Sequence, residues 1–368
     1  MRGACPQPLI HDGQWVSTLV TDRLQTPLTR ALGCRTPIIQ TAMGWVATPE
    51  LVIGSVSAGA MGFLAAAVMT PEECVSALEQ IKGSTSAPFG VNLHSFQPGV
   101  DRIVDACIDH EVAAISYGRA PSGKLIERVK RAGIHCVPTI GAAKHARKAL
   151  ALGADILVCQ GGEGGGHTGE TPTWLLLAQV LDMNPGVPVV ACGGFRDGRG
   201  LAAALTFGAD GIAMGTRFLL TAESPTPAAT KARYLDAEVT QIRVSSRLDG
   251  LPQRMIANRR LESLERASPL RLLLIALNSG WRFKRHTGAS LAEMLKTSWA
   301  MARQTDMSFG QTLMAANAPM IIQESMVNGR PDEGVLPSGQ VAGLIDDLPT
   351  CSELIGAITA EAEERLMP

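Results

Sequence analysis

The chain has 368 residues, with 33 basic and 34 acidic side chains and a formal net charge of −1 at pH 7. This length can bury the core of one large domain with an appendage, and the balanced charge argues against nucleic acid or an anionic membrane as the main partner. Eight cysteines are scattered without a C-x-x-C pair, which favours reduced thiols and a cytoplasmic location over disulfides or zinc. We therefore expect no metal site, no nucleic-acid partner and no membrane partner.

No segment of the sequence is interpreted as a membrane span or a signal peptide. The uncharged run at residues 51–68 is long enough to cross a bilayer. It is rich in Ser, Ala and Gly, however, and we interpret it as a small-residue helix, a turn and a buried strand. The N-terminus lacks a basic region followed by an apolar core, so no signal peptide is expected.

The first 30 residues contain several prolines and are expected to form an irregular N-terminal arm. Residues 31–222 then alternate short apolar runs with helical patterns. The expected strands cover residues 37–40, 62–66, 89–93, 113–116, 134–138, 155–159, 187–191 and 211–214. The expected helices cover residues 49–58, 71–82, 100–110, 124–132, 143–152, 173–181 and 199–207. Eight apolar strands that alternate with helices indicate a parallel sheet and predict a closed (β/α)8 TIM barrel of the α/β class, with an open doubly wound sheet as the alternative.

The pattern changes after the eighth expected strand. Residues 223–335 hold helical runs, including residues 269–277 and 291–303, and are interpreted as a helical cap over the mouth of the barrel. Residues 336–368 return as a loop followed by an amphipathic helix, which is expected to close the barrel.

A glycine-rich loop at residues 160–169 follows one expected strand and precedes a helix. It contains His167 and Glu163, and barrel enzymes carry their active sites on such loops. Residues 164–169 match G-x-G-x-x-G, but that dinucleotide motif expects a carboxylate after the next strand, where this chain has Cys192, Gly193 and Gly194. We therefore reject a Rossmann fold and expect His167 at the barrel mouth; a tight turn with a hydrogen-bonded histidine is the alternative.

Two further glycine-bearing strand ends follow the seventh and eighth expected strands. Gly193 and Gly194 follow the seventh, and Gly215 and Thr216 follow the eighth. In TIM barrels these loops, with a helix N-terminus, commonly bind a phosphate through backbone N–H groups. We expect a phosphate group here, and ordinary barrel turns are the alternative.

Residues 37–46, 88–92, 160–169, 193–200 and 214–218 together resemble the nitronate monooxygenase (2-nitropropane dioxygenase-like) family, which also includes flavin-dependent enoyl-acyl-carrier-protein reductases. The resemblance covers residues 30–222 together with residues 339–340, and it implies a barrel that holds FMN, with His167 as the active-site histidine. The cofactor-binding residues that it implies are Ala42, Met43, Gly44, Asn92, Gln160, Gly165, Gly166, Gly193, Gly194, Gly215, Thr216 and Gln340. A histidine beside a flavin can exchange a proton with substrate, because its unperturbed pKa lies near neutrality.

Residues 141–148, 160–169, 314–320 and 339–343 are similar to one branch of this family, found in bacterial steroid breakdown. This likeness extends to the C-terminus and implies a flavin-dependent enzyme acting on a hydroxylated methyl-oxo-indane propanoyl-CoA, with NAD(P)H as co-substrate. The substrate-binding candidates are Lys144, Glu163, Arg243, Arg247 and Arg254. For any single arginine a solvated helix face is the alternative to a CoA phosphate contact, Lys144 could be a rim residue without chemistry, and Glu163 could instead steer His167 or cap the loop.

The sequence thus predicts an FMN-dependent oxidoreductase that transfers a hydride between NAD(P)H, flavin and an acyl-CoA derived from steroid C and D rings. The first alternative is a nitronate monooxygenase that oxidises alkyl nitronates with oxygen. The second is a non-catalytic barrel that binds flavin or a phosphate ligand. The exact substrate, the choice between NADH and NADPH, the direction of the reaction and a homo-oligomeric state remain open.

Overall fold

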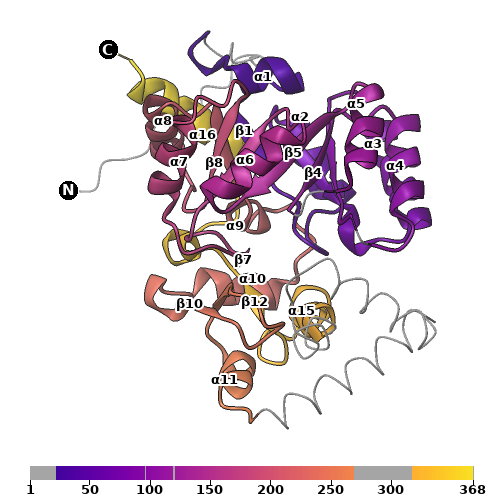
Figure 1. Cartoon of the computed structure of the whole chain (residues 1–368). Coiled ribbons are helices and arrows are strands. Elements are labelled where there is room, and N and C mark those ends of the chain that lie inside the picture. Colours follow the sequence, from indigo (N-terminus) through magenta and orange to yellow (C-terminus); the bar gives the residue numbers. More distant parts are fainter. Residues whose placement is uncertain (1–21, 96, 119–120, 269–316, 368) are drawn as a thin grey trace, which may run out of the picture.

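A computed structural model describes residues 22–95, 97–118, 121–268 and 317–367 (Figure 1). The helical runs predicted at residues 269–277 and 291–303 lie outside these ranges, as do most of the predicted N-terminal arm and the first residues of the motif at 314–320.

Eight parallel strands form a closed barrel, which confirms the predicted fold and excludes the open sheet. The barrel closes where the first strand pairs with the last, through Ile38 with Ile212 and Gln40 with Met214. In barrel order the strands are β1 (Ile38–Gln40), β2 (Met61–Ala65), β3 (Gly90–Asn92), β4 (Ala114–Tyr117), β5 (His135–Ile140), β6 (Leu157–Gln160), β8 (Val189–Cys192) and β9 (Gly211–Met214).

The helices between these strands lie where the sequence predicted them, with ends that differ by one or two residues. They are α2 (Pro49–Ser57), α3 (Pro71–Ser84), α4 (Val100–Asp109), α5 (Gly123–Arg131), α6 (Ala143–Ala151), α7 (Thr173–Leu181) and α8 (Gly198–Phe207), with the short turn η2 (Ala66–Val68) before α3. Local interactions explain where several helices begin or end. Thr70 and Glu73 form a capping box at the start of α3, and Gly208 ends α8 in the left-handed conformation.

One helix was not expected. The turn η1 (Asp22–Leu24) leads into α1 (Pro27–Leu32), so the chain is already regular within the segment predicted as an irregular arm. Leu28 and Leu32 of α1 are buried in one cluster with Phe63, Val158 and other side chains of the barrel strands. Helix α1 therefore covers one end of the barrel interior, and the carboxyl ends of the strands remain for the site.

Beyond β9 the chain contains more strand than predicted. Among the residues that the structure describes here, the helices are α9 (Thr216–Leu219), α10 (Ala228–Leu235), α11 (Arg259–Glu265) and α15 (Asn317–Met326), with the turn η3 (Val239–Gln241). The strands β10 (Ile242–Ser245), β11 (Gln253–Ile256) and β12 (Leu336–Pro337) form an antiparallel sheet, to which the short strand β7 (Gly166–His167) also pairs. Among its described residues, the segment predicted as a helical cap therefore also contains strands. Figure 1 shows the segment on one side of the barrel, with β7 between the two.

The chain then returns to the barrel through η4 (Gln340–Leu344) and ends in α16 (Cys351–Arg365). This helix packs against α8 and α2. The contact with α8 is close, since a Cβ on Gly198 would lie 2.6 Å from the Ile358 carbonyl oxygen.

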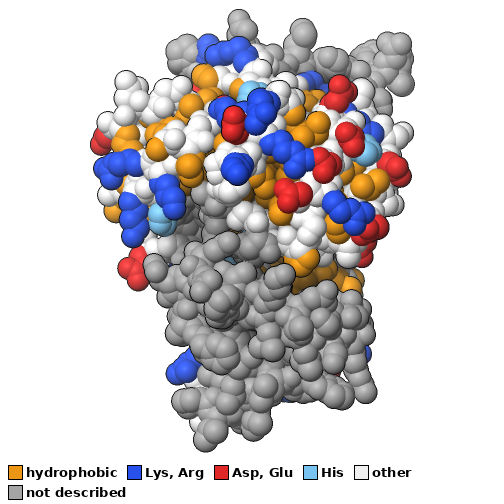
Figure 2. All heavy atoms as spheres, turned by 45° about the vertical axis from the view of Figure 1, so that its right-hand side comes forward, with side chains coloured by type: hydrophobic (Ala, Val, Ile, Leu, Met, Phe, Trp, Pro, Cys, Tyr) orange, Lys and Arg blue, Asp and Glu red, His pale blue; other side chains and the backbone are white. Residues whose placement is uncertain are grey.

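The outer face of the barrel carries both signs of charge. On the face shown in Figure 2, basic and acidic side chains are interspersed over the barrel helices. Several form ion pairs between neighbouring elements, such as Arg102 with Glu72 and Lys130 with Asp155. Within the described ranges, no helix is long and apolar enough to cross a membrane.

Candidate active site

The loops after β8, β9 and β1 lie side by side, because these strands are neighbours in the barrel. Thr41 N donates a hydrogen bond to the Met214 carbonyl at 3.1 Å. A Cβ on Gly215 would lie 3.0 Å from Thr41 Oγ1 and 3.3 Å from Met43 Sδ. Barrel closure thus brings the predicted ring-facing residues and the predicted phosphate-binding residues together.

The loop after β1 is held in a strained turn. Trp45 has a φ of 62°, one of three non-glycine residues with positive φ among those described. The Met43 carbonyl accepts hydrogen bonds from Val46 N at 3.0 Å and Ala47 N at 2.9 Å, which fix the turn. Such strain is frequent at ligand sites, and here it leaves Ala42, Met43 and Gly44 half-buried at the mouth.

The glycines after β8 and β9 leave backbone donors free. Gly193 and Gly194 have φ values of 107° and 86°, which favour glycine. A Cβ on Gly193 would lie 2.9 Å from Thr173 Oγ1, so that position has no room for a side chain. Among the described residues, the N–H groups of Gly194, Gly215 and Thr216 donate to no protein acceptor. These half-buried or exposed donors fit the phosphate of FMN.

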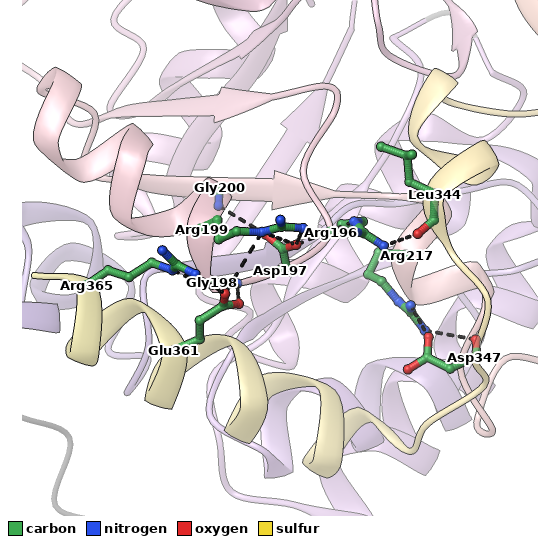
Figure 3. A network of polar contacts seen from close by, with 10 residues as sticks. All are labelled: Arg196, Asp197, Gly198, Arg199, Gly200, Arg217, Leu344, Asp347, Glu361 and Arg365. Atoms are coloured by element: carbon green, nitrogen blue, oxygen red, sulfur yellow. Dashed lines mark hydrogen bonds and ion pairs between the residues drawn. The ribbon is translucent and has the colours of Figure 1, made fainter. Parts of the chain in front are cut away.

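The N-terminus of α8 does not contribute to this cradle. Glu361 Oε2 accepts from Gly198 N at 2.9 Å, and Asp197 Oδ1 accepts from Gly200 N at 3.3 Å (Figure 3). Burial would raise the pKa of Asp197, but hydrogen bonds and ion pairs, chiefly from Arg199, outweigh this and lower it. Two carboxylates therefore occupy the first turn of α8 and would repel a phosphate, so the expected phosphate would be held by the donors at Gly194, Gly215 and Thr216 and not by this helix terminus.

Asn92 stands at the end of β3, with its side chain half-buried. Its Nδ2 donates to the Ser116 carbonyl and to Ser116 Oγ, both at 3.1 Å. These two bonds orient the amide through Nδ2 and leave Oδ1 to accept other hydrogen bonds. The geometry is suited to the flavin contact that the resemblance implies.

The glycine-rich loop is packed mainly against protein. A Cβ on Gly161 would lie 2.2 Å from Thr173 Oγ1, and one on Gly165 would lie 2.5 Å from Gly339 N. Only Gly166 in this loop has a positive φ, of 66°. Gly161 is thus required by the close approach of α7 and Gly165 by that of the returning segment, whereas positive φ explains only Gly166.

Glu163 is held by helix α7, away from His167. Its Oε2 accepts from Thr173 N at 2.8 Å and from Thr173 Oγ1 at 2.7 Å, so it caps the first turn of α7. Thr173 Oγ1 also lies 3.1 Å from the Gly193 carbonyl oxygen. Of the two alternatives left open for Glu163, capping the loop is the one that these contacts support.

The imidazole of His167 pairs with a residue that sequence analysis missed. His167 Nε2 lies 2.7 Å from Asp249 Oδ2, and the side chains are 59% and 5% exposed, respectively. Asp249 lies in the turn between β10 and β11, and the pairing of His167 with Gln253 across β7 and β11 brings it there. No sequence signal links two residues separated by 82 positions, one of them in a segment interpreted as helical.

The returning segment crosses directly over the glycine-rich loop. Gln340 N donates to the Glu163 carbonyl at 2.9 Å, and Gly339 N donates to Thr216 Oγ1 at 2.9 Å. Gln160, at the end of β6, uses its Nε2 to bond the His167 carbonyl at 2.9 Å. Gln340 and Gln160 therefore lie at the site, and both hold the loop that carries His167.

The remaining cationic candidates are dispersed. Arg254 Nε donates to the Gly162 carbonyl at 2.9 Å, and burial lowers the pKa of this arginine although Glu163 opposes the shift. Arg243 pairs with Glu265 at 2.7 Å. Arg247 and Lys144 are exposed. Arg254 thus braces the glycine-rich loop, and Arg243 is engaged by Glu265.

The chain was compared with known proteins. The family model described as nitronate monooxygenase matches residues 25–100 and 95–361. A Mycobacterium tuberculosis protein named (3aS,4S,5R,7aS)-5-hydroxy-7a-methyl-1-oxo-octahydro-1H-indene-4-carboxyl-CoA dehydrogenase is 46% identical over 342 residues, covering 92% of this chain and 96% of that protein. A probable nitronate monooxygenase of Staphylococcus haemolyticus is 30% identical over 288 residues, covering 65% of this chain and 80% of that protein. The solved structure of FabK from Thermotoga maritima has a TM-score of 0.76 and 27% identity, covering 93% of this chain and 97% of that chain.

The dehydrogenase's name also corrects one detail. It specifies an indene carboxyl-CoA, so the thioester carbonyl in that relative's compound is attached to the ring. The sequence resemblance had implied a propanoyl side chain.

Proposed function

The chain belongs to the nitronate monooxygenase family and is an oxidoreductase, and from this premise we propose that it is an FMN enzyme acting on the CoA thioester of a cyclic acid derived from steroid C and D rings. It transfers a hydride between this substrate, the flavin and NAD(P)H, and it works in the cytoplasm. The observation that carries the proposal is the similarity to the indene carboxyl-CoA dehydrogenase, which covers 92% of this chain and 96% of that protein.

The proposed cofactor site rests on backbone N–H groups that donate to no protein acceptor among the described residues and on glycines that leave room for a ligand. The N–H groups of Gly194, Gly215 and Thr216 would hold the phosphate, and the half-buried turn at Met43 and Gly44 would contact the ring. Asn92 would present its Oδ1 to the ring. Bound FMN supplies the hydride acceptor and donor, while these residues fix its position and exclude water from its face.

His167 is the proposed acid–base residue. Its ring is exposed at the mouth, and Asp249 holds one of its two nitrogens. The other nitrogen is available to exchange a proton with substrate, which can accelerate a reaction by about 10²–10⁴-fold. The exposed Arg247 and Lys144 remain candidates for the CoA phosphates, since cations at an exposed rim suit such groups.

Nitronate oxidation is the second candidate, and the match to the staphylococcal protein favours it. That similarity covers less of this chain than the similarity to the dehydrogenase does. A small nitronate also gives no reason for cations at the rim of the site.

Anaerobic stopped-flow absorbance at the flavin bands tests the proposal. The FMN-loaded protein is mixed with NADH, NADPH, an indene carboxyl-CoA thioester or an alkyl nitronate. We expect bleaching by the hydroxylated thioester, or bleaching by a nicotinamide followed by recovery with an unsaturated thioester. Bleaching by the nitronate alone would contradict the proposal and support nitronate oxidation.

Replacing the histidine tests its proposed role. We expect His167→Ala to retain FMN, because none of the proposed phosphate donors belongs to His167, and to slow flavin reduction by thioester about 10²–10⁴-fold. The measurements are the flavin-to-protein absorbance ratio and the single-turnover rate. Loss of FMN from this variant would show that His167 supports the cofactor instead.

A further inference from the structure

We propose that Asp249 is a positioning residue that fixes the tautomer of His167, so that Nδ1 is the nitrogen that exchanges a proton with substrate. The kinetic consequence rests on the function proposed above. The tautomer itself is a property of the folded chain and can be measured without flavin or substrate.

The first step of the argument is the geometry of the pair. His167 Nε2 lies 2.7 Å from Asp249 Oδ2, within hydrogen-bond distance. The carboxylate is almost fully buried whereas the imidazole is open to the mouth. The buried partner therefore orients the exposed one.

The second step is the set of groups around the carboxylate. Asp249 Oδ2 also accepts from Gln253 Nε2 at 2.6 Å, and Oδ1 accepts from Leu251 N at 3.0 Å. An ionised carboxylate only accepts hydrogen bonds. His167 must therefore be the donor in its bond to Asp249, and Nε2 of the neutral ring carries the proton.

The third step is the consequence for the other nitrogen. In a neutral imidazole one nitrogen donates and the other accepts. With the proton on Nε2, the lone pair is on Nδ1. When substrate gives up a proton, the new N–H bond forms at Nδ1, the electron pair of the broken bond remains on the substrate, and the Asp249 charge stabilises the imidazolium.

The arrangement is built by the sheet beyond the barrel. The pairing of β7 with β11 sets His167 opposite Gln253, four residues after Asp249. Gly250, at a φ of 83°, turns the chain between these two residues. The same short sheet thus positions both the Asp249 carboxylate and the Gln253 side chain that donates a hydrogen bond to it.

The tautomer is tested by ¹⁵N nuclear magnetic resonance of the full chain labelled at histidine. Long-range correlations distinguish Nε2–H from Nδ1–H rings, and the spectrum of His167→Ala assigns the signal. We expect Nε2–H in the wild type and a shift toward Nδ1–H in Asp249→Asn, because the asparagine amide can donate to Nε2. The exposed Asp236 provides the control, and Asp236→Asn should leave the signal unchanged.

Kinetics and a conservative variant complete the test. Asp249→Asn should lower kcat roughly 10–100-fold, part of the usual acid–base contribution, with KM changed much less. Asp249→Glu keeps a carboxylate acceptor, so it should restore the Nε2–H signal and part of kcat. It also provides a readout if the Asn variant folds poorly.

The outcomes separate this inference from the proposed function. An Nδ1–H ring in the wild type, or an unchanged ring in Asp249→Asn, would overturn the inference even if the enzyme oxidises CoA thioesters. An Nε2–H ring that depends on Asp249, in a protein inactive toward thioesters, would support the positioning role and overturn only the proposed function.

Discussion

At Gly165 the chain has no room for a single additional carbon. A Cβ there would lie 2.5 Å from Gly339 N and 2.6 Å from the carbonyl carbon of Ser338, both backbone atoms that cannot rotate away. These backbone atoms belong to the segment that also bonds Thr216 and Glu163. A change at Gly165 would therefore displace the returning segment as well as the glycine-rich loop.

We expect Gly165→Ala to lower the free energy of unfolding by about 1–3 kcal/mol, the usual cost of overpacking, and to weaken FMN binding. Gly83→Ala is the matched control, since Gly83 lies exposed in α3 with nothing within 4 Å of its Cβ position. In a helix this change should stabilise by about 0.5–1 kcal/mol. Urea unfolding of both variants measures the difference, and equal effects would contradict the packing argument.

At the scale of one element, α16 depends on its first turn. Thr350 and Glu353 form a capping box, in which Thr350 Oγ1 accepts from Glu353 N and Glu353 Oε2 accepts from Thr350 N at 2.8 Å. The backbone N–H of Thr350 and then its hydroxyl hold the pKa of Glu353 below its ordinary value of 4.5. The stability that the cap gives to the start of α16 should therefore depend on pH.

The sign of this dependence follows from the lowered pKa. A carboxyl with a lowered folded-state pKa contributes stability above its unfolded pKa, and that stability is lost as the pH falls through the folded value. Thr350→Ala should cost about 0.5–2 kcal/mol near pH 7. The difference from the wild type should shrink below pH 4.5, where Glu353 becomes protonated in the unfolded and then the folded chain. Urea midpoints between pH 7 and pH 3 measure it, and a difference that is constant with pH would contradict this account.

At the scale of the whole molecule, the C-terminal segment ties together parts of the barrel that are distant in sequence. Arg217 of α9 is almost fully buried and donates to the Leu220 carbonyl. It also donates to the Asp347 side chain, and Arg196 donates to the Leu344 carbonyl (Figure 3). Helix α16 covers α8 and α2 with an apolar face that includes Ile355 and Ile358. Barrel and C-terminal segment should therefore unfold as one unit.

The variant Ile358→Ala tests whether the barrel and α16 unfold together. Ile358 is 2% exposed, and its truncation should cost about 2–5 kcal/mol. Far-ultraviolet circular dichroism and tryptophan fluorescence should shift together, since the barrel loses stability with the helix. Ser352→Ala, on the exposed face of α16, should change neither midpoint appreciably. Two separate transitions in Ile358→Ala would show that α16 unfolds independently.

The barrel fold could be predicted from local patterns in the sequence. Uniformly apolar strands such as β6 and β8 alternate with amphipathic helices, and this pattern depends only on near neighbours in the chain. Strand-end glycines such as Gly194 and Gly215 also marked the mouth, because strand polarity in a barrel places all carboxyl ends on one side. The sequence by itself therefore determined the barrel and which loops lie at the carboxyl ends of its strands.

Only the tertiary structure decided which residues meet. Asp249 reaches His167 through the pairing of β7 with β11, and Glu163 turns to the first turn of α7, yet neither contact has a sequence signature. The carboxylate of Glu361, in the last helix, occupies the N-terminus of α8 and keeps it from a phosphate. Such contacts join residues far apart in the chain and depend on packing and register, which local propensity does not encode.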